Sequence, residues 1–499
     1  MKETFKCYIK TLAPIHIGCD EIYEPTGFLI DENARTLNAF DPIAFISSLD
    51  AEERDKIMAI CRKGDISSIL EIYKFLRGKT YPGKEVGVCQ GFVSHYQKTL
   101  FIPTHKQRMI QQELNKFEIS RTSFLAGDQR PYIPGSSVKG AIRTAYLNDL
   151  NKANQAPTEK WKYTAKNLEK KLLDSSSFDT DPFRMLKVSD FMPVGDIKAK
   201  IVYAVNEKKK SSAHEARGPY QILEVILPGA VFEGLITVER PLGKSKIRRP
   251  LSLKSLSESL KSFYKKEKNR EQAELQKIQL SHVFEFGDQA LPIRIGQHSG
   301  AESVTIEGHR DIRIMGVQRG DAKFDDHATT FWFASDESKA KDKSKLLPFG
   351  WAELHELTGN LENEFSEKET VWVENKKKAR AKQKEEIQRQ EQEVARAGEL
   401  KKARELEEKR EAEEAVTRKA ALDAMSPEDR AIEELKSLDI TEARAVEIYN
   451  GLDEFSDDKR WVAAQGLKDY WVSIGKWKKK GCSKKQLKKV AAVKGLIGE

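Results

Sequence analysis

The sequence predicts an α+β protein with two α+β units, followed by a long charged helix and a small all-α module. A chain of 499 residues is too long for one compact core. Strand-like and helix-like segments interleave without the regular spacing of a large parallel sheet, and the composition changes sharply near Asn375. We therefore predict four regions: 1–185, 186–374, 375–425 and 426–499.

The first unit begins with residues 4–12, TFKCYIKTL, whose alternation and β-formers indicate a strand. A second strand is expected at Gly27–Asp31, and an Asn/Asp turn leads to a third. Residues 41–78 carry apolar side chains at helical spacing, and YIPGSSVKGAIRTAYLNDL reads as a turn followed by a helix.

The second unit contains strand-like stretches, one polar helix and a glycine-rich segment. The expected strands are FRMLKVSDFM, KIVYAVNE, QILEVILPGAVFEGLITVER and a last piece near LLPFGWAELHEL. The helix is expected at residues 252–280, and the glycine-rich segment is LPIRIGQHSGAESVTIEGHRDIRIMG.

Residues 375–425 mix basic and acidic side chains, lack proline and contain few apolar residues, which predicts an isolated charged helix rather than a coiled coil. A new helix should start with Ser426 as N-cap and Pro427 at its first position. The chain from Lys476 holds nine lysines and the single acid Glu499. Such a tail attracts anionic polymers, but a solvated helix face explains it equally well.

Composition excludes several classes of protein. A charged fraction of 33% and a net charge of +9 are typical of a soluble protein and compatible with an anionic partner. Five scattered cysteines without a C-x-x-C pair indicate neither a disulfide framework nor a zinc site. No signal peptide and no 18-residue apolar run is present, so we expect a cytoplasmic protein that does not use a membrane.

The segment RPYIPGSSVKGAIRTAYLNDL, residues 130–150, has the residue types of a phosphate-binding helix start. Helix N-termini present unpaired N–H groups and positive potential. Ser136 and Ser137 add hydroxyls, Gly135 permits close approach, and Lys139 and Arg143 add positive charge. The same residues also fit an ordinary surface helix capped by serine.

Five segments occur in order along the chain: PIHIG, YIPGSSVKGAIRTA, DPFRMLKVSD, ILPGAVFEGLITV and LPIRIGQHSG. In this combination the chain resembles the RAMP proteins of CRISPR–Cas systems over roughly residues 1–357. P-G-S-S-x-K-G-x-x-R is shared by many RAMP proteins, whereas DPFRMLKVSD is similar to the cap subunit of type III-A (Csm) effector complexes.

The resemblance implies ferredoxin-like, RRM-related units and a groove in which the single-stranded guide RNA (crRNA) is held by its backbone. It implies a non-catalytic subunit that needs no cofactor and no metal. The implied partners are crRNA, the adjacent backbone RAMP subunit, the small helical subunit, and host nucleases that trim the crRNA 3′ end.

Sequence-independent binding of RNA requires cations, hydroxyls and glycines that face phosphates. The candidate RNA-binding residues are His16, Arg121, Arg130, Gly135, Ser136, Ser137, Lys139, Arg143, Arg294, Gly296, Gln297, His298, Arg310 and Arg313. Each arginine has the alternative of pairing with a local carboxylate, as Asp311 offers to Arg310 and Arg313.

Two further hypotheses remain open. The chain could be a RAMP endoribonuclease: Asp20 would be a displaced metal-site aspartate, or His16, Tyr23 and Lys139 would perform metal-free acid–base chemistry. Pro25, Thr26 and Gly27 stand where the backbone subunits carry their catalytic aspartate, which favours the non-catalytic reading. Alternatively, residues 375–499 could recruit another protein or a distal nucleic acid.

Overall fold

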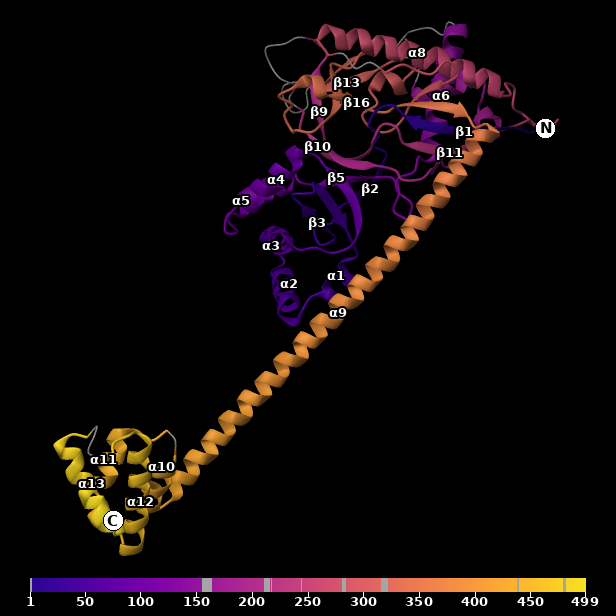
Figure 1. Ribbon diagram of the computed structural model, residues 1–499. Coiled ribbons are helices and arrows are strands. Elements are labelled where there is room, and N and C mark those ends of the chain that lie inside the picture. The colour runs from indigo at the N-terminus through magenta and orange to yellow at the C-terminus, as the bar shows by residue number, and fades with distance from the viewer. Residues whose placement is uncertain are drawn as a thin grey trace. The chain divides into compact units, whose positions relative to one another are not determined.

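The computed structural model describes residues 2–154, 164–210, 216, 218–243, 245–280, 284–315, 322–437, 439–478 and 482–499. It forms two compact units, Met1–Val394 and Ala395–Glu499 (Figure 1). None of the helices in these described ranges combines the length and apolar character that crossing a membrane requires.

Sheet A of the first unit is antiparallel, with the strand order β12-β17-β1-β11-β7 and with β8 paired to β11. Its strands are β1 (Lys2–Thr11), β7 (Leu186–Val188), β8 (Met192–Pro193), β11 (Val231–Glu239), β12 (Leu291–Arg294) and β17 (Trp351–Glu356). Alternating residues such as Cys7 and Ile9 in β1 point into the core, because side chains of a strand alternate between its two faces.

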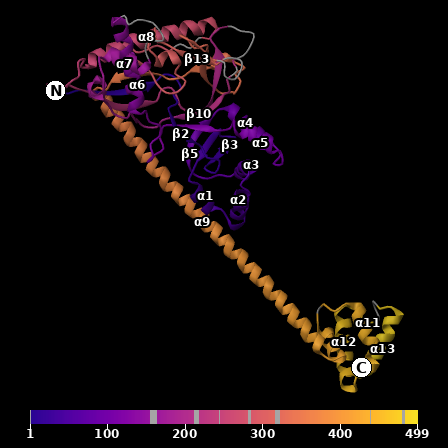
Figure 2. The ribbon, with the colours of Figure 1, turned by 180° about the vertical axis from the view of Figure 1, so that it is seen from behind.

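Two helices, α6 (Gly135–Asn154) and α8 (Leu253–Lys277), lie side by side against this buried face (Figures 1 and 2). The succession β1-α6-β7-β11-α8-β17, in the spatial order β17-β1-β11-β7, is the β-α-β-β-α-β arrangement of a ferredoxin-like unit. β12 extends this unit at its edge.

Sheet B is mixed, with the order β2-β6-β10-β9-β5-β4-β3, and β15 pairs with both β9 and β16. Its strands are β2 (Gly18–Ile22), β3 (Phe28–Asp31), β4 (Thr36–Ala39), β5 (Lys84–Val88), β6 (Ile119–Thr122), β9 (Ala199–Lys208), β10 (Gln221–Ile226), β15 (Thr330–Ser335) and β16 (Leu347–Pro348). These strands come from three insertions into the ferredoxin-like unit: after β1, between β8 and β11, and between β12 and β17.

Short helices cover one face of sheet B, where Tyr73, Phe92 and Tyr96 join its core. The five helices of the first insertion are α1 (Pro42–Ser48), α2 (Ala51–Lys63), α3 (Ile66–Leu76), α4 (Gln90–Leu100) and α5 (Gln107–Leu114). The remaining small elements are α7 (Ala165–Leu173), the hairpin β13 (Ile312–Met315) and β14 (Ala322–Asp325), and the 3₁₀ turns η1 (Phe178–Thr180), η2 (Pro182–Met185), η3 (Ala301–Val304) and η4 (Lys343–Lys345).

The sheets do not separate at residue 185. Each sheet takes strands from both sides of that position, so the ferredoxin-like unit around sheet A runs from β1 to β17. Sequence patterns identify strands but not their partners, and insertions place partners far apart in the chain. The α+β class is confirmed, while the two consecutive units 1–185 and 186–374 stay a prediction as domains.

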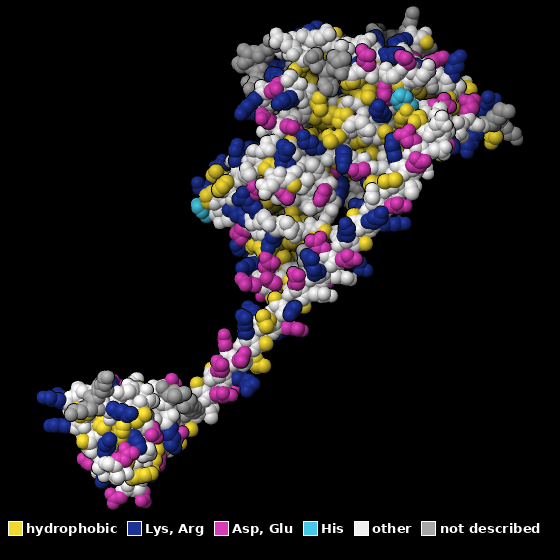
Figure 3. Space-filling model, in the orientation of Figure 1, with side chains coloured by type: hydrophobic (Ala, Val, Ile, Leu, Met, Phe, Trp, Pro, Cys, Tyr) yellow, Lys and Arg dark blue, Asp and Glu magenta, His cyan; other side chains and the backbone are white. Residues whose placement is uncertain are grey.

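Helix α9 (Gly359–Ala424) starts earlier than the predicted charged helix at residues 375–425. Its first turns pack on sheet A: Phe365 contacts the Tyr8 ring edge-on at 5.2 Å between centroids, and Lys6 pairs with Glu362 at 2.8 Å. These contacts extend the helix before the composition changes. Farther along, Lys and Arg side chains intermingle with Asp and Glu on its surface (Figure 3).

The second unit closes around its own core, which includes Leu467 and Trp471. Its helices after α9 are α10 (Pro427–Lys436), α11 (Glu442–Asn450), α12 (Asp457–Ser473) and α13 (Lys484–Ile497), with the turn η5 (Leu452–Glu454). Ser426 caps α10 by accepting the Asp429 N–H, as the sequence predicts.

Candidate nucleic-acid interface

The PIHIG segment (14–18), which links β1 to β2, is the point on which the other predicted segments converge. Ile15 and Ile226 exchange two backbone hydrogen bonds of 3.0 and 2.8 Å, which attaches the ILPG stretch. The Gln297 N–H donates to the His16 carbonyl at 2.8 Å, which attaches the IGQHSG loop. Segments far apart in the sequence therefore meet between the two sheets.

The PGSS segment (134–137) reaches the same junction through two steps. The Ser123 N–H donates to the Ile17 carbonyl at 2.7 Å, and the Tyr132 N–H donates to the Ser123 carbonyl at 3.2 Å. Ile133 then forms an antiparallel bridge with Phe191, directly after the KVSD segment. All five segments of the sequence pattern thus belong to one connected seam of backbone.

The IGQHSG loop (295–300) needs glycine where it crosses PIHIG. Gly296 has φ +88°, and a Cβ there would lie 2.5 Å from the His16 carbonyl oxygen. His298 contacts the Trp332 ring at 4.3 Å between centroids with the planes tilted by 30°, and its Nε2 lies 2.9 Å from Gln221 Oε1. Burial, followed by the nearby His16, lowers the pKa of His298 to about 4, so its ring is neutral at pH 7. Gln297 and Gly18 stay exposed beside it.

The start of α6 is already partly occupied by a carboxylate. The Gly135 N–H donates to Asp190 Oδ1 at 2.8 Å, and a Cβ on Gly135 would lie 2.5 Å from the Ser189 carbonyl oxygen. The prediction that this helix start is a phosphate cradle therefore needs correction, because Asp190 holds the Gly135 N–H and repels an anion. Ser136 is exposed and Ser137 half-buried, so their hydroxyls remain near the surface.

Lys139 lies one turn into α6 and is half-buried. Its Nζ donates to the Leu186 carbonyl at 2.7 Å, a contact that leaves its charge uncompensated. Burial, together with repulsion from Lys187 and an opposing attraction from Asp181, leaves the pKa of Lys139 lowered. Lys187 is exposed in KVSD. The two lysines are neighbouring cations within the predicted segments.

Arg143 is neutralised by two carboxylates. Its guanidinium contacts Glu169 at 2.7 Å and Asp181 at 3.1 Å, and it lies over the Phe183 ring at 4.8 Å. For Arg143 the structure therefore shows pairing with local carboxylates, the alternative to an RNA contact.

Arg130 and Arg121 have internal partners as well. Arg130 forms a two-pronged ion pair with Glu369 at 2.8 Å and lies 3.4 Å from the Trp372 ring, so it anchors α9. Arg121 donates to Gln129 at 2.9 Å, and its guanidinium lies 3.5 Å from the centroid of the Phe124 ring. Both side chains are largely covered, with 13% of Arg121 and 11% of Arg130 exposed, and Arg121 lines the groove beside Tyr23 described below.

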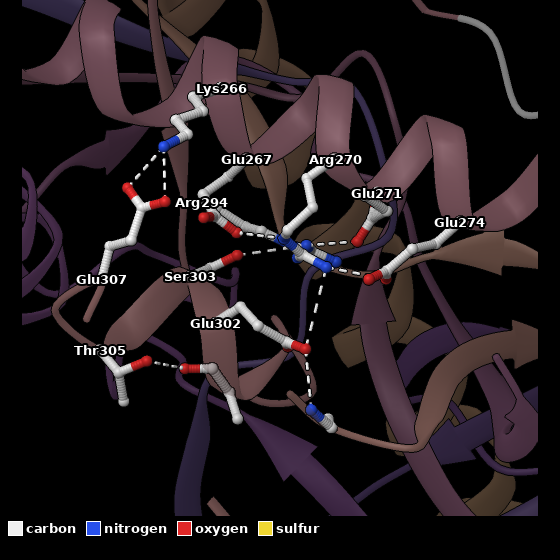
Figure 4. A network of polar contacts seen from close by, with 12 residues as sticks. Lys266, Glu267, Arg270, Glu271, Glu274, Arg294, Glu302, Ser303, Thr305 and Glu307 are labelled. Atoms are coloured by element: carbon white, nitrogen blue, oxygen red, sulfur yellow. Dashed lines mark hydrogen bonds and ion pairs between the residues drawn. The ribbon is translucent and has the colours of Figure 1, made fainter. Parts of the chain in front are cut away.

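Arg294 and Arg310 are interior residues, which corrects the prediction that they line an RNA groove. They are 3% and 5% exposed and pair with Glu271 and Glu267 on α8. Figure 4 shows the pair of Arg294 and Glu271. A buried guanidinium that already holds a carboxylate cannot reach a phosphate. Arg313, on the β13–β14 hairpin, is exposed and remains available.

The residues considered for catalysis lie in different environments. His16 is 1% exposed, and its Nδ1 lies 2.8 Å from the Glu224 carbonyl oxygen. Burial lowers the pKa of His16, so its ring is a neutral structural group. Tyr23 is 6% exposed, whereas Asp20 is on the surface with φ +59°.

A groove of about 630 Å³ beside Tyr23 was not predicted from the sequence. Phe40 and Tyr81 line it, and α9 contributes Lys376 and Arg380. Nothing in the sequence connects α9 with residues some 300 positions earlier. Lys187 was also missed, although it lies inside the quoted segment DPFRMLKVSD.

One exposed cluster could hold a cation. Asp325, Asp326 and His327 form the only group of three potential ligands within the described ranges, and His327 Nδ1 lies 2.8 Å from Asp326. The cluster follows β14 and contains none of the predicted site residues.

No curated protein matches this sequence. Among solved structures, the chain is similar to a chain of the Csm–crRNA–target RNA ternary complex of a type III-A CRISPR–Cas system. The TM-score is 0.45 and the identity 18%, over 71% of this chain and 100% of that one. It is also similar to Csm5 of T. onnurineus, with a TM-score of 0.39 and 17% identity over 69% of this chain and 99% of that one. The RAMP superfamily profile matches residues 8–420. Because this match spans most of the sequence, the protein belongs to the RAMP superfamily.

Proposed function

We propose that the protein is a non-catalytic, crRNA-binding cap subunit of a type III CRISPR ribonucleoprotein. In this role it holds the 3′ part of the guide RNA and ends the filament of backbone RAMP subunits. Membership in the RAMP superfamily supports the class, and DPFRMLKVSD supports the cap position. The carrying observation is that the other four sequence segments connect with PIHIG in one continuous seam of backbone hydrogen bonds.

The RNA contacts in this proposal lie along the exposed parts of that seam. One end offers the exposed Ser136 and Lys187 with the half-buried Lys139, and the other offers the exposed Gln297 with the half-buried His298. Lysines would meet phosphates as point charges, while the neutral His298 ring and the exposed amide offer stacking and hydrogen bonds. These residues would contact the sugar-phosphate backbone of the RNA rather than its bases. A subunit that accepts guides of any sequence requires contacts of this kind.

The non-catalytic part of the proposal is supported by the environment of His16. General acid–base catalysis needs a proton-transferring group within reach of the substrate. His16 is interior and bonded to a backbone carbonyl, and Pro25–Gly27 stand where a catalytic aspartate is expected. The partners proposed with the guide are the adjacent RAMP subunit, the small helical subunit and nucleases that trim the crRNA 3′ end.

The test is a salt titration of full-length protein with unstructured single-stranded RNA, comparing wild type with the double variant Lys139→Gln/Lys187→Gln. Each phosphate contact contributes about 0.7 to the slope of log K against log salt for single strands. We expect the double variant to lose about 1.4 from that slope.

The matched control is Lys106→Gln/Arg108→Gln at the N-terminal end of α5, which removes the same charge from exposed residues remote from the seam in sequence. Its slope should stay near that of wild type, and the RNA should remain full length with or without Mg²⁺. A wild-type affinity that does not respond to salt would overturn the proposal, and so would RNA cleavage that Asp20→Ala or His16→Ala abolishes.

A further inference from the structure

The C-terminal module has a strongly uneven distribution of charge. From Ser426 to Gly475, 12 carboxylates accompany 6 cations, whereas nine lysines accompany one carboxylate from Lys476 onward. This module lies beyond residue 420, where the match to the RAMP superfamily ends. The residues that carry this charge therefore lie outside the family match.

Helix α13 carries most of this positive charge on its outward face. Val490 and Val493 point into the core of the module, whereas Lys484, Lys485 and Lys488 are exposed. Lys489 and Lys494 are half-buried and lie over aromatic rings, 5.7 Å from Tyr449 and 5.5 Å from Trp477.

Six cations of the module outside α13 are neutralised by carboxylates of the same module, in contrast to the exposed lysines of α13. These pairs are Lys436–Glu433, Arg444–Glu434, Lys459–Asp429, Arg460–Asp457, Lys468–Glu499 and Lys476–Glu442, whereas Lys478 is exposed like the lysines of α13. In the described part of the chain, no carboxylate pairs with Lys484, Lys485 or Lys488. Three neighbouring charges are thus left for a ligand outside the module.

The position of Lys484 and Lys485 at the N-terminus of α13 destabilises the helix when no anion is bound. Carboxylates belong in the first turn of a helix and cations in the last, because the N-terminus carries positive potential. The other helices of the module carry acids in their first turns: Glu428 and Asp429 in α10, Glu442 in α11, and Asp457 and Asp458 in α12. Helix α13 has no acid in its first turn and places Lys484 and Lys485 there. Its positive end would be stabilised by an external anion.

We propose that the outward face of α13 is a second nucleic-acid site, which binds the sugar-phosphate backbone of a polynucleotide without reading its sequence. The exposed Ala491, Ala492 and Gly495 continue this face with small side chains, so a backbone can approach the helix closely. The acidic remainder of the module directs the polyanion to α13. Lysine ammonium groups on one helix face bind phosphates of single or double strands alike, so the phosphate chain is the ligand.

The experiment compares full-length Lys484→Gln/Lys485→Gln/Lys488→Gln with wild type in salt titrations. The probes are an unstructured 30-nucleotide RNA and a 30-base-pair DNA duplex. Three lost contacts should lower the slope of log K against log salt by about 2 for the single strand and about 2.7 for the duplex. Near 0.1 M salt this corresponds to an affinity loss on the order of 10²-fold for the single strand. A larger change with one probe identifies which polynucleotide the site prefers.

The matched control is Lys401→Gln/Lys402→Gln/Lys409→Gln, which removes the same charge from exposed positions of α9. The proposal requires this control to keep the wild-type slope. Repeating the α13 substitutions with Lys139→Gln/Lys187→Gln separates the two sites. If only the α13 substitutions change the slope, the α13 site holds and the RNA contacts of the proposed function fail. If only Lys139→Gln/Lys187→Gln changes the slope, the α13 site is refuted and the proposed function stands. An equal loss of slope in the control would also overturn the proposal. So would a parallel assay in which the α13 lysines bind vesicles of anionic lipid but neither polynucleotide.

Discussion

Arg294→Met is expected to lower the free energy of unfolding of the first unit by about 3–5 kcal/mol. Arg294 is 3% exposed, pairs with Glu271 and donates from Nε to the Phe349 carbonyl at 3.0 Å. Removing it leaves the Glu271 carboxylate buried without its cation, which costs far more than the pair itself contributes. Urea unfolding followed by tryptophan fluorescence would measure the change, since Trp351 donates to the same carboxylate at 2.7 Å.

Two variants control this prediction. Arg294→Met/Glu271→Gln removes both charges while keeping an oxygen for Trp351, and it should recover most of the lost stability. Arg313→Met changes an exposed arginine from the same glycine-rich region and should shift stability by no more than about 0.5 kcal/mol. Equal effects at Arg294 and Arg313 would contradict the interior placement of Arg294.

Glu302→Gln is expected to remove about 3 kcal/mol of stability at pH 7 and to flatten the acid limb of the stability profile. Glu302 is 1% exposed, and its burial alone would raise the pKa. The ion pair with Lys209 and the charge of Arg270 outweigh burial and lower the pKa of Glu302 to about 2 (Figure 4). A drop from 4.5 to about 2 corresponds to roughly 3 kcal/mol of linkage.

The sign follows from which state binds the proton. The folded pKa lies below the unfolded one, so the stabilisation is complete above about pH 4.5 and is lost as pH falls toward 2. Urea midpoints at pH 7, 5, 4 and 3 should converge for wild type and Glu302→Gln as the pH falls. Glu364→Gln, which breaks a half-exposed pair with Lys368, should run parallel to wild type at a cost below about 1 kcal/mol. A constant gap for Glu302→Gln at all four pH values would contradict the linkage.

The sequence predicted individual elements well because their signals are local. The helix expected at 252–280 is α8 (Leu253–Lys277), and the strand expected at 200–207 lies within β9 (Ala199–Lys208). Ser426 and Pro427 marked the start of α10 through capping chemistry alone. The pairing of strands could not be predicted in this way, because insertions place paired strands of sheet A far apart in the sequence. The strands β1 and β17 are the extreme case.

The error at Arg294 and Arg310 had a signal in the sequence. On α8 the apolar residues Leu256, Leu260, Phe263 and Tyr264 form a stripe, and Glu267, Glu271 and Glu274 continue it at the same spacing. Carboxylates in the buried stripe of a helix require buried cations. The arginines of the glycine-rich region were the available partners, so their likeness to RNA-binding residues was misleading.

The sequence predicted which backbone segments meet in the seam, but it did not predict which cations near the seam face solvent. Glycine and proline set chain paths locally, which is why PIHIG, PGSS and IGQHSG were found and do meet. Whether a cation faces solvent or a carboxylate depends on tertiary neighbours, as Arg143 with Glu169 and Lys187 without a partner carboxylate among the described residues illustrate.

The most direct test of the RNA path is photo-crosslinking of full-length protein to unstructured RNA that contains 4-thiouridine, with mass spectrometry of the crosslinked peptides. Within Met1–Val394, crosslinks should fall in residues 135–139, 187–189 and 296–298. Crosslinks confined to α4 and α5, or none in this unit at an RNA concentration that saturates binding, would contradict the account.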